Sequence, residues 1–127
     1  MLPVVDDRWF IRQVGKRMLW VPADGEKVRS PRGFEGYEFF SHRPYENGVF
    51  LKSGWVITEA RTGAVCVEPS PTQEVARRRL AAKFRQFTAA AIADITEQRC
   101  QKYGLSPRYQ HPAAEQDTRP RKKAVKA

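Results

Sequence analysis

Residues 69–72, with the sequence Pro-Ser-Pro-Thr, mark the point at which the spacing of apolar residues changes along this chain. Before it, residues 55–59 and 64–67 are rich in β-branched and apolar residues and flank Gly63, which is typical of a β-hairpin. After it, apolar side chains recur every three or four residues, as they do along one face of an α-helix. A strand-rich segment followed by a helical one predicts an α+β protein.

The helical pattern after this point continues over many turns. Its apolar positions are spaced by 4, 4, 3, 4 and 4 residues, and they are Ala76, Leu80, Phe84, Phe87, Ala91 and Ile95. Ser70 is predicted to cap a helix over residues 71–103, which Gly104 ends. A helix of that length would extend roughly 50 Å. It either breaks near residues 88–93, or its distal half extends beyond the sheet and packs against another chain.

The first half of the chain predicts a small antiparallel sheet of four to five strands, drawn from residues 8–68. A hairpin is expected at residues 9–21, where a Gly-Lys pair suits a two-residue turn. Residues 23–36 contain three glycines and one proline and are expected to form a loop. The predicted fold is therefore one α+β domain over residues 1–105, in which this sheet packs against one long C-terminal helix.

Positive charge is concentrated toward the C-terminal end of the chain. The whole sequence carries 23 Lys and Arg against 14 Asp and Glu, a formal net charge of +9. Residues 1–70 hold ten basic and nine acidic residues, whereas residues 71–105 hold seven and three, and residues 106–127 hold six and two. Such an asymmetry is typical of a protein that binds a polyanion, most often nucleic acid and otherwise a membrane surface or an acidic protein.

Two groups of basic residues form the predicted nucleic-acid-binding or anion-binding site. One lies at the start of the predicted helix, where the helix dipole disfavours positive charge and an external phosphate would relieve the conflict. The other lies in residues 106–127, a predicted disordered basic tail with three prolines and no apolar periodicity. The site residues are Arg77, Arg78, Arg79, Lys83 and Arg85 in the helix, and Arg119, Arg121, Lys122 and Lys123 in the tail. The alternative is that the helical cations cover apolar surface with their stems, and that the tail only confers solubility.

The strands offer a second way to contact nucleic acid. A face on which bases stack could form from Trp9, Trp20 and Trp55 together with Arg12, Lys16 and Arg17. Aromatic residues that alternate with polar ones in strands more often pack in the core, however. The sequence alone favours the core for these rings.

Few residues suit catalysis or metal binding. His42, Arg43 and Glu46 are residue types that a metal-independent ribonuclease needs, which makes such an enzyme a remote alternative. Cys66 could pair with His42 as a nucleophile, but a cysteine between two valines of a strand is usually a small buried hydrophobe. The spacing of the two His and two Cys matches no zinc site, and a disulfide between Cys66 and Cys100 is not required. We therefore expect no enzymatic activity, cofactor or metal.

One segment resembles a known pattern. Residues 55–64, with the sequence WVITEARTGA, and residues 71–76, PTQEVA, resemble small domains of phage and plasmid proteins, in which such a hairpin leads into a helix. The resemblance covers residues 48–82, about a quarter of the chain. The order of strands and helix also resembles DNA-binding domains of the integrase and AP2 type, whose sheets are strongly basic, unlike residues 48–70 here. These resemblances imply an accessory protein of a mobile genetic element.

The sequence thus predicts a non-enzymatic accessory protein that contacts nucleic acid or a nucleoprotein complex through a basic helix face and tail. The alternative is an inhibitor or adaptor that docks on an acidic protein surface, and the distal helix could form a homodimer. No apolar run reaches the roughly 20 residues that span a bilayer. Residues 1–7 lack the basic and apolar segments of a secretory signal. We expect a cytoplasmic location and no membrane partner.

Overall fold

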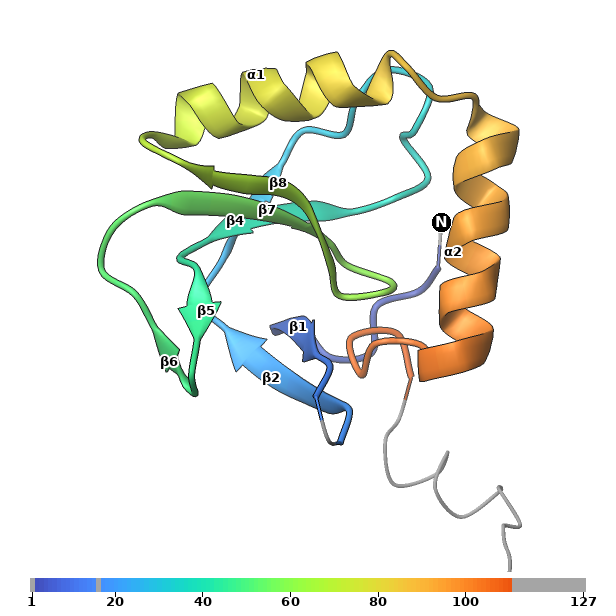
Figure 1. Cartoon of the computed structure of the whole chain (residues 1–127). Coiled ribbons are helices and arrows are strands. Elements are labelled where there is room, and N and C mark those ends of the chain that lie inside the picture. The colour runs from blue at the N-terminus through green and yellow to red at the C-terminus, as the bar shows by residue number, and fades with distance from the viewer. Residues whose placement is uncertain (1, 16, 111–127) are drawn as a thin grey trace, which may run out of the picture.

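The computed structural model describes residues 2–15 and 17–110. In this part of the chain, eight strands form three antiparallel sheets, and two helices follow them (Figure 1). The predicted α+β class with antiparallel strands is confirmed. The prediction of one sheet is wrong, since the strands divide into one four-stranded and two two-stranded sheets.

The four-stranded sheet carries the main core. Its strands, in spatial order, are β3 (Glu26–Val28), β4 (Phe39–His42), β7 (Trp55–Glu59) and β8 (Ala64–Ser70). The predicted hairpin around Gly63 is β7–β8, and Gly63 has the positive φ of 67° that its turn requires. β3 lies within residues 23–36, where the sequence predicts a loop. A strand of three residues is too short to show an alternating pattern, and it is defined here by its pairing with β4.

Two hairpins lie beside this sheet and stay separate from it. They are formed by β1 (Trp9–Gln13) with β2 (Leu19–Ala23), and by β5 (Tyr45–Glu46) with β6 (Val49–Phe50). The first is the hairpin predicted at residues 9–21. A hydrogen bond of 3.1 Å from the Arg12 N–H to the Gly63 carbonyl joins β1 to the β7–β8 turn rather than to a neighbouring strand. The second hairpin turns through Asn47 and Gly48, which both have positive φ.

The predicted helix over residues 71–103 is two helices, α1 (Gln73–Phe84) and α2 (Ala89–Tyr103). A new helix begins after the break because the Thr88 hydroxyl accepts a hydrogen bond of 3.1 Å from the Ala91 N–H. The single long helix is therefore wrong. Of the two alternatives for such a helix, the break is the one observed.

The ends of the helices differ in how well the sequence predicts them. α1 begins after Thr72, whose hydroxyl accepts a hydrogen bond of 3.1 Å from the Val75 N–H. Ser70, the predicted cap, is instead the last residue of β8. Gly104 ends α2 as predicted, with a φ of 85° and an N–H that donates to the Cys100 carbonyl at 2.8 Å.

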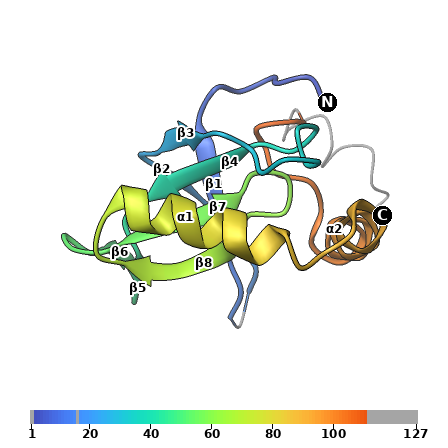
Figure 2. The same ribbon diagram turned by 90° about the horizontal axis from the view of Figure 1, so that it is seen from above.

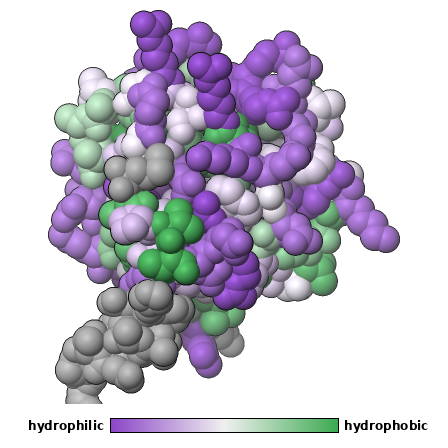
Figure 3. Space-filling model, turned by 180° about the vertical axis from the view of Figure 1, so that it is seen from behind, coloured by the Kyte–Doolittle hydropathy of each residue, from purple (hydrophilic) through white to green (hydrophobic). Residues whose placement is uncertain are grey.

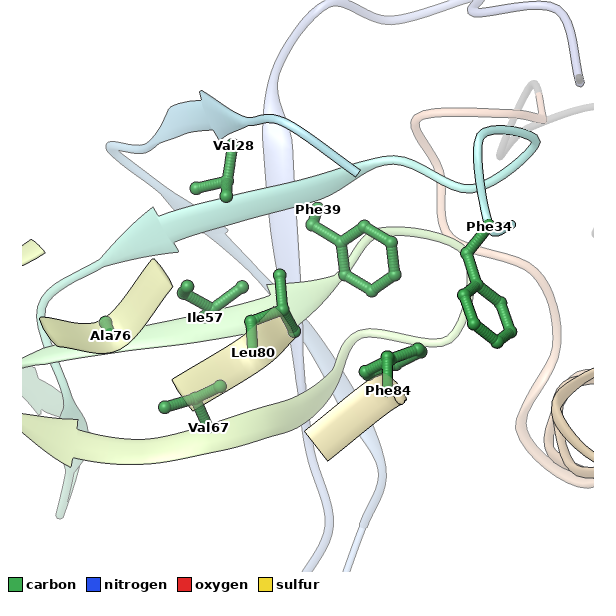
Figure 4. Packing of buried hydrophobic residues seen from close by; sticks show 8 residues of the cluster. All are labelled: Val28, Phe34, Phe39, Ile57, Val67, Ala76, Leu80 and Phe84. Carbon is green, nitrogen blue, oxygen red and sulfur yellow. The ribbon is translucent and has the colours of Figure 1, made fainter. Parts of the chain in front are cut away.

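α1 lies across one face of the four-stranded sheet, whereas α2 stands beside the sheet and is seen end-on in Figure 2. The cluster between α1 and the sheet (Figure 4) consists of Val28, Phe34, Phe39, Ile57, Val67, Ala76, Leu80 and Phe84. Neighbouring residues of a strand point to opposite faces. Phe40 therefore lies on the other face, in a second cluster with Ile11, Ala60 and Tyr109. Both faces of the sheet are thus buried. α1 covers one of them, and the side of α1 that faces away from the sheet is exposed to solvent.

The chain after α2 returns to the fold instead of leaving it. Ser106, Arg108 and Tyr109 are buried, and Arg108 donates two hydrogen bonds to the Glu38 carboxylate, at 2.9 and 3.1 Å. The sequence places these residues in the disordered tail, because nothing local reveals a partner so distant in the chain. The rest of the predicted tail, residues 111–127, lies outside the described residues.

Candidate nucleic-acid interface

α1 presents the five predicted helical site residues around three of its sides. Its buried residues, Ala76, Leu80 and Phe84, are spaced one turn apart and face the sheet. At 3.6 residues per turn, the five cations fall on the two flanks of this stripe and on the side opposite to it. All five side chains are exposed.

Arg79 and Lys83 lie on the flank that faces β8. An Arg79 guanidinium nitrogen donates to the Ser70 hydroxyl at 2.9 Å, and the Lys83 Nζ donates to the Cys66 carbonyl at 2.7 Å. β8 is an outer strand of its sheet, so these bonds cover backbone and side-chain groups at an open edge. The two cations are therefore partly engaged by the fold, although neither forms an ion pair with another described residue.

Arg77, Arg78 and Arg85 are the free members of the group. Within residues 2–15 and 17–110, none of their side chains makes an ion pair, a hydrogen bond or a contact with an aromatic ring. Arg78 and Arg85 are two turns apart and point away from Leu80, and Arg77 lies on the flank opposite to Arg79. Hydrophilic side chains line the upper edge of the molecule, where α1 lies (Figure 3).

The argument from the sequence that the dipole of one long helix disfavours all five cations is wrong. A helix over residues 71–103 would have held all five cations near its positive end. α1 has only 12 residues, so Lys83 lies in its last turn and Arg85 is its C-cap, where the dipole favours cations. What distinguishes this surface is that the charges of Arg77, Arg78 and Arg85 lack partners among the described residues.

Sequence reasoning could have added other basic residues to the predicted site. Most of those that are described have partners within the fold. Arg guanidinium groups lie over aromatic rings in four long-range pairs: Arg12 over Tyr103 at 4.1 Å, Arg43 over Trp55 at 3.8 Å, Arg61 over Tyr37 at 4.6 Å and Arg108 over Trp9 at 3.8 Å. Sequence reasoning missed these pairs, because each joins residues from different elements.

The tryptophan rings do not form the base-stacking face considered from the sequence. Trp9 stacks on Phe40 with ring centroids 4.8 Å apart, and the Arg108 guanidinium covers it as well. Arg43 covers Trp55. Trp20 lies against the β7–β8 turn and is half-buried. The structure thus favours the packing role for these rings.

The residues considered for catalysis are brought together only in part: His42 and Glu46 line one hollow of about 240 Å³, whereas the Arg43 guanidinium lies over Trp55. His42 is 1% exposed, and its ring nitrogens lie 2.7 Å from the Arg43 carbonyl and 2.7 Å from the Thr58 hydroxyl. Burial lowers the pKa of His42, so the neutral ring is favoured. Cys66 packs against the cluster under α1, on the other face of the sheet from His42, and burial raises the pKa of its thiol to about 12. Cys66 and Cys100 are both free thiols.

The other predicted features are tested only in part. Arg119, Arg121, Lys122 and Lys123 lie outside the described residues. Among those that are described, no group of three or more His, Cys, Asp or Glu side chains could hold a metal ion. No helix in the described ranges has the length and apolar composition to cross a membrane. Comparisons with protein-family models, curated proteins and solved structures found no match.

Proposed function

We propose that this protein is a non-enzymatic accessory protein that binds nucleic acid through the outer face of α1. The observation that carries the proposal is the contrast among its cations. Arg77, Arg78 and Arg85 are exposed and have no partner among the described residues, whereas Arg43 and Arg108 are held on aromatic rings. Exposed cations gathered on one element without partners are suited to an external polyanion.

The spacing on α1 suits contacts to a phosphate backbone. Arg78 and Arg85 are seven residues apart, which places them about 10 Å apart along the helix axis. Phosphates of one strand of a duplex follow each other every 3.4 Å along the axis, so the two side chains can reach different phosphates. Arg79 and Lys83 lie at the margin of this face, and the cations of residues 119–123 would add further contacts. Such contacts carry no sequence information, so binding would tolerate many sequences.

The biological setting rests on the resemblance of residues 48–82 to phage and plasmid domains, which makes a mobile genetic element the proposed context. The second candidate is an inhibitor or adaptor that docks on an acidic protein, because the same free cations could meet carboxylates. A homodimer through α2 stays a prediction. Ile92 packs on the main core of its own chain, while Ile95 is 36% exposed.

We expect the full chain to bind duplex DNA and single-stranded RNA of unrelated sequence with similar affinity. Neutralising three phosphates of a duplex would make the affinity fall roughly 40-fold between 50 and 200 mM salt. Fluorescence anisotropy of labelled oligonucleotides measures this, with polyglutamate of matched charge as competitor. If no oligonucleotide binds at low salt, the proposal is wrong. Binding to polyglutamate that exceeds binding to either nucleic acid would favour the acidic-protein partner instead.

A further inference from the structure

α2 is held by few contacts to the sheet beside which it stands (Figure 1). Of its 15 residues only Thr96 is buried, whereas α1 buries three of its 12. Ile92 packs against the main core, and Ile95 is exposed. Within residues 2–15 and 17–110, no side chain of α2 forms an ion pair, and its one side-chain hydrogen bond between charged or amide groups, from Gln101 to Glu97, stays inside the helix. Little therefore fixes α2 to the rest of the fold.

A hollow of about 40 Å³ lies between α2 and the core. Ile92 and Thr96 line it from α2, and Phe39, Cys66 and Phe84 line it from the sheet and α1. Side chains that border a hollow lack packing contacts on that side, so they gain less dispersion energy than in a close-packed interior. Docking of α2 is thus weaker than its length suggests.

The last turn of α2 covers a buried cation. The Arg12 guanidinium of β1 lies 4.1 Å from the centre of the Tyr103 ring. Its Nε and Nη1 atoms are buried and have no hydrogen-bond acceptor among the described residues. A donor that loses water without gaining an acceptor is unfavourable, and burial together with the nearby charge of Arg99 lowers the pKa of Arg12. Detachment of α2 would return these donors to water.

The chain on either side of α2 is held independently of the helix. Before it, Phe84 is buried in the main core, and the Phe87 N–H donates to the Phe84 carbonyl. After it, the Ser106 N–H donates to the Arg61 carbonyl at 3.0 Å, next to the buried Arg108. α2 can therefore leave the sheet while both flanking segments stay in place.

We propose that α2 detaches from the sheet as a unit while the core between α1 and the sheet stays folded, and that hydration of Arg12 favours the detached form. Proteins open in cooperative units, and elements with few buried contacts open at the lowest free energy. The opening exposes the residues that line the hollow, Cys66 and Phe84 among them. The inference concerns the chain alone and holds whether or not α1 binds nucleic acid.

The Cys66 thiol reports on this opening in the full chain. It lines the hollow under α2, and burial raises its pKa to about 12, so iodoacetamide should react with it only in the detached form. Mass spectrometry of the labelled peptides separates Cys66 from Cys100. Below the unfolding transition, the labelling rate of Cys66 should be nearly independent of urea, because detachment of one helix exposes little surface. A rate that follows the global unfolding equilibrium over this range would overturn the proposal.

Ile92→Ala removes the α2 side chain that packs on the main core. It is expected to raise the labelling rate of Cys66 about tenfold. The matched control is Val28→Ala, which trims a residue of the same cluster on β3 and should leave the rate within about twofold. Equal increases in both variants would contradict an opening of α2 that is separate from global unfolding.

Arg12→Met tests the part assigned to the buried cation. Methionine keeps an unbranched apolar stem beside Tyr103 but has no donor to leave unpaired, so labelling of Cys66 should slow by about fivefold or more. Arg17→Met removes an exposed cation near the same hairpin and should leave the rate unchanged. An unchanged or faster rate in Arg12→Met would overturn the role given to Arg12. Nucleic acid plays no part in these readouts, so their outcome is separate from that of the proposed function.

Discussion

Replacing Arg108 with methionine is expected to lower the free energy of unfolding by about 3–5 kcal/mol, because it leaves a buried carboxylate with only the exposed Lys27, at 3.6 Å, as a cationic partner. Glu38 is 4% exposed. Its carboxylate receives both guanidinium bonds from Arg108 and a bond of 2.6 Å from the Tyr109 hydroxyl. Arg108 also donates to backbone carbonyls at Asp7 and Arg8 and covers Trp9. One side chain therefore joins the chain after α2, the start of β4 and the N-terminal segment.

Urea unfolding of the full chain measures this loss. The control is Arg8→Met, which breaks the exposed ion pair between Arg8 and Asp6 and should cost far less, because solvent screens that pair. Equal effects of the two variants would show that the Arg108 network is not a principal support of the fold.

The same network gives stability a defined pH dependence. Burial alone would raise the pKa of Glu38, but hydrogen bonds from Arg108 and Tyr109 and the charges of Arg108 and Lys27 lower it to about 2. A glutamate in an unfolded chain has a pKa of about 4.3. The contribution is therefore fully present above about pH 4.3 and is lost as the pH falls toward about 2. Glu38→Gln should flatten the fall, leaving the contribution of Asp6, whose pKa Arg8 also lowers to about 2.

Replacing Gly63 with alanine is expected to destabilise the fold by about 3–4 kcal/mol, through strain and overpacking together. Gly63 has a φ of 67°, which an L-residue adopts at a cost. A Cβ at this position would lie 2.5 Å from the Trp20 ring and 2.7 Å from the Arg12 backbone nitrogen. The Arg12 N–H donates to the Gly63 carbonyl, so the substitution would push the β1–β2 hairpin away from the β7–β8 turn.

The matched control for this change is Gly48→Ala. Gly48 also has a positive φ, of 84°, but a Cβ there would meet nothing within 4 Å. The control should therefore cost only the backbone strain, about 1 kcal/mol. Thermal unfolding of both variants separates strain from overpacking, and equal shifts in Tm would contradict the close packing at Gly63.

The local patterns in the sequence predict the local structure well. The hairpin closed by Gly63 has long arms of β-branched residues, and the buried face of α1 follows the spacing of Ala76, Leu80 and Phe84. Both features arise from neighbours along the chain, so a period is enough to reveal them. The exposure of Arg77, Arg78 and Arg85 follows from the same spacing.

The features that the sequence does not reveal depend on contacts between distant residues. The break after α1 contains neither Gly nor Pro, and Thr88 looks like any other helix residue until it caps α2. β3 has three residues, and β5 and β6 have two each, which is too short to show a period. Arg108 and Glu38 are separated by most of the chain, so Arg108 looked like another tail cation.

The salt dependence of DNA binding tests the central claim most directly. In R77Q/R78Q/R85Q, the slope of log K against log salt should become shallower by about 2–3, because each lost phosphate contact removes about 0.9. R17Q/K52Q/K102Q removes the same charge from exposed positions outside α1 and should leave the slope nearly unchanged. Slopes that fall equally in both variants would show that only net charge matters, and would contradict a binding face on α1.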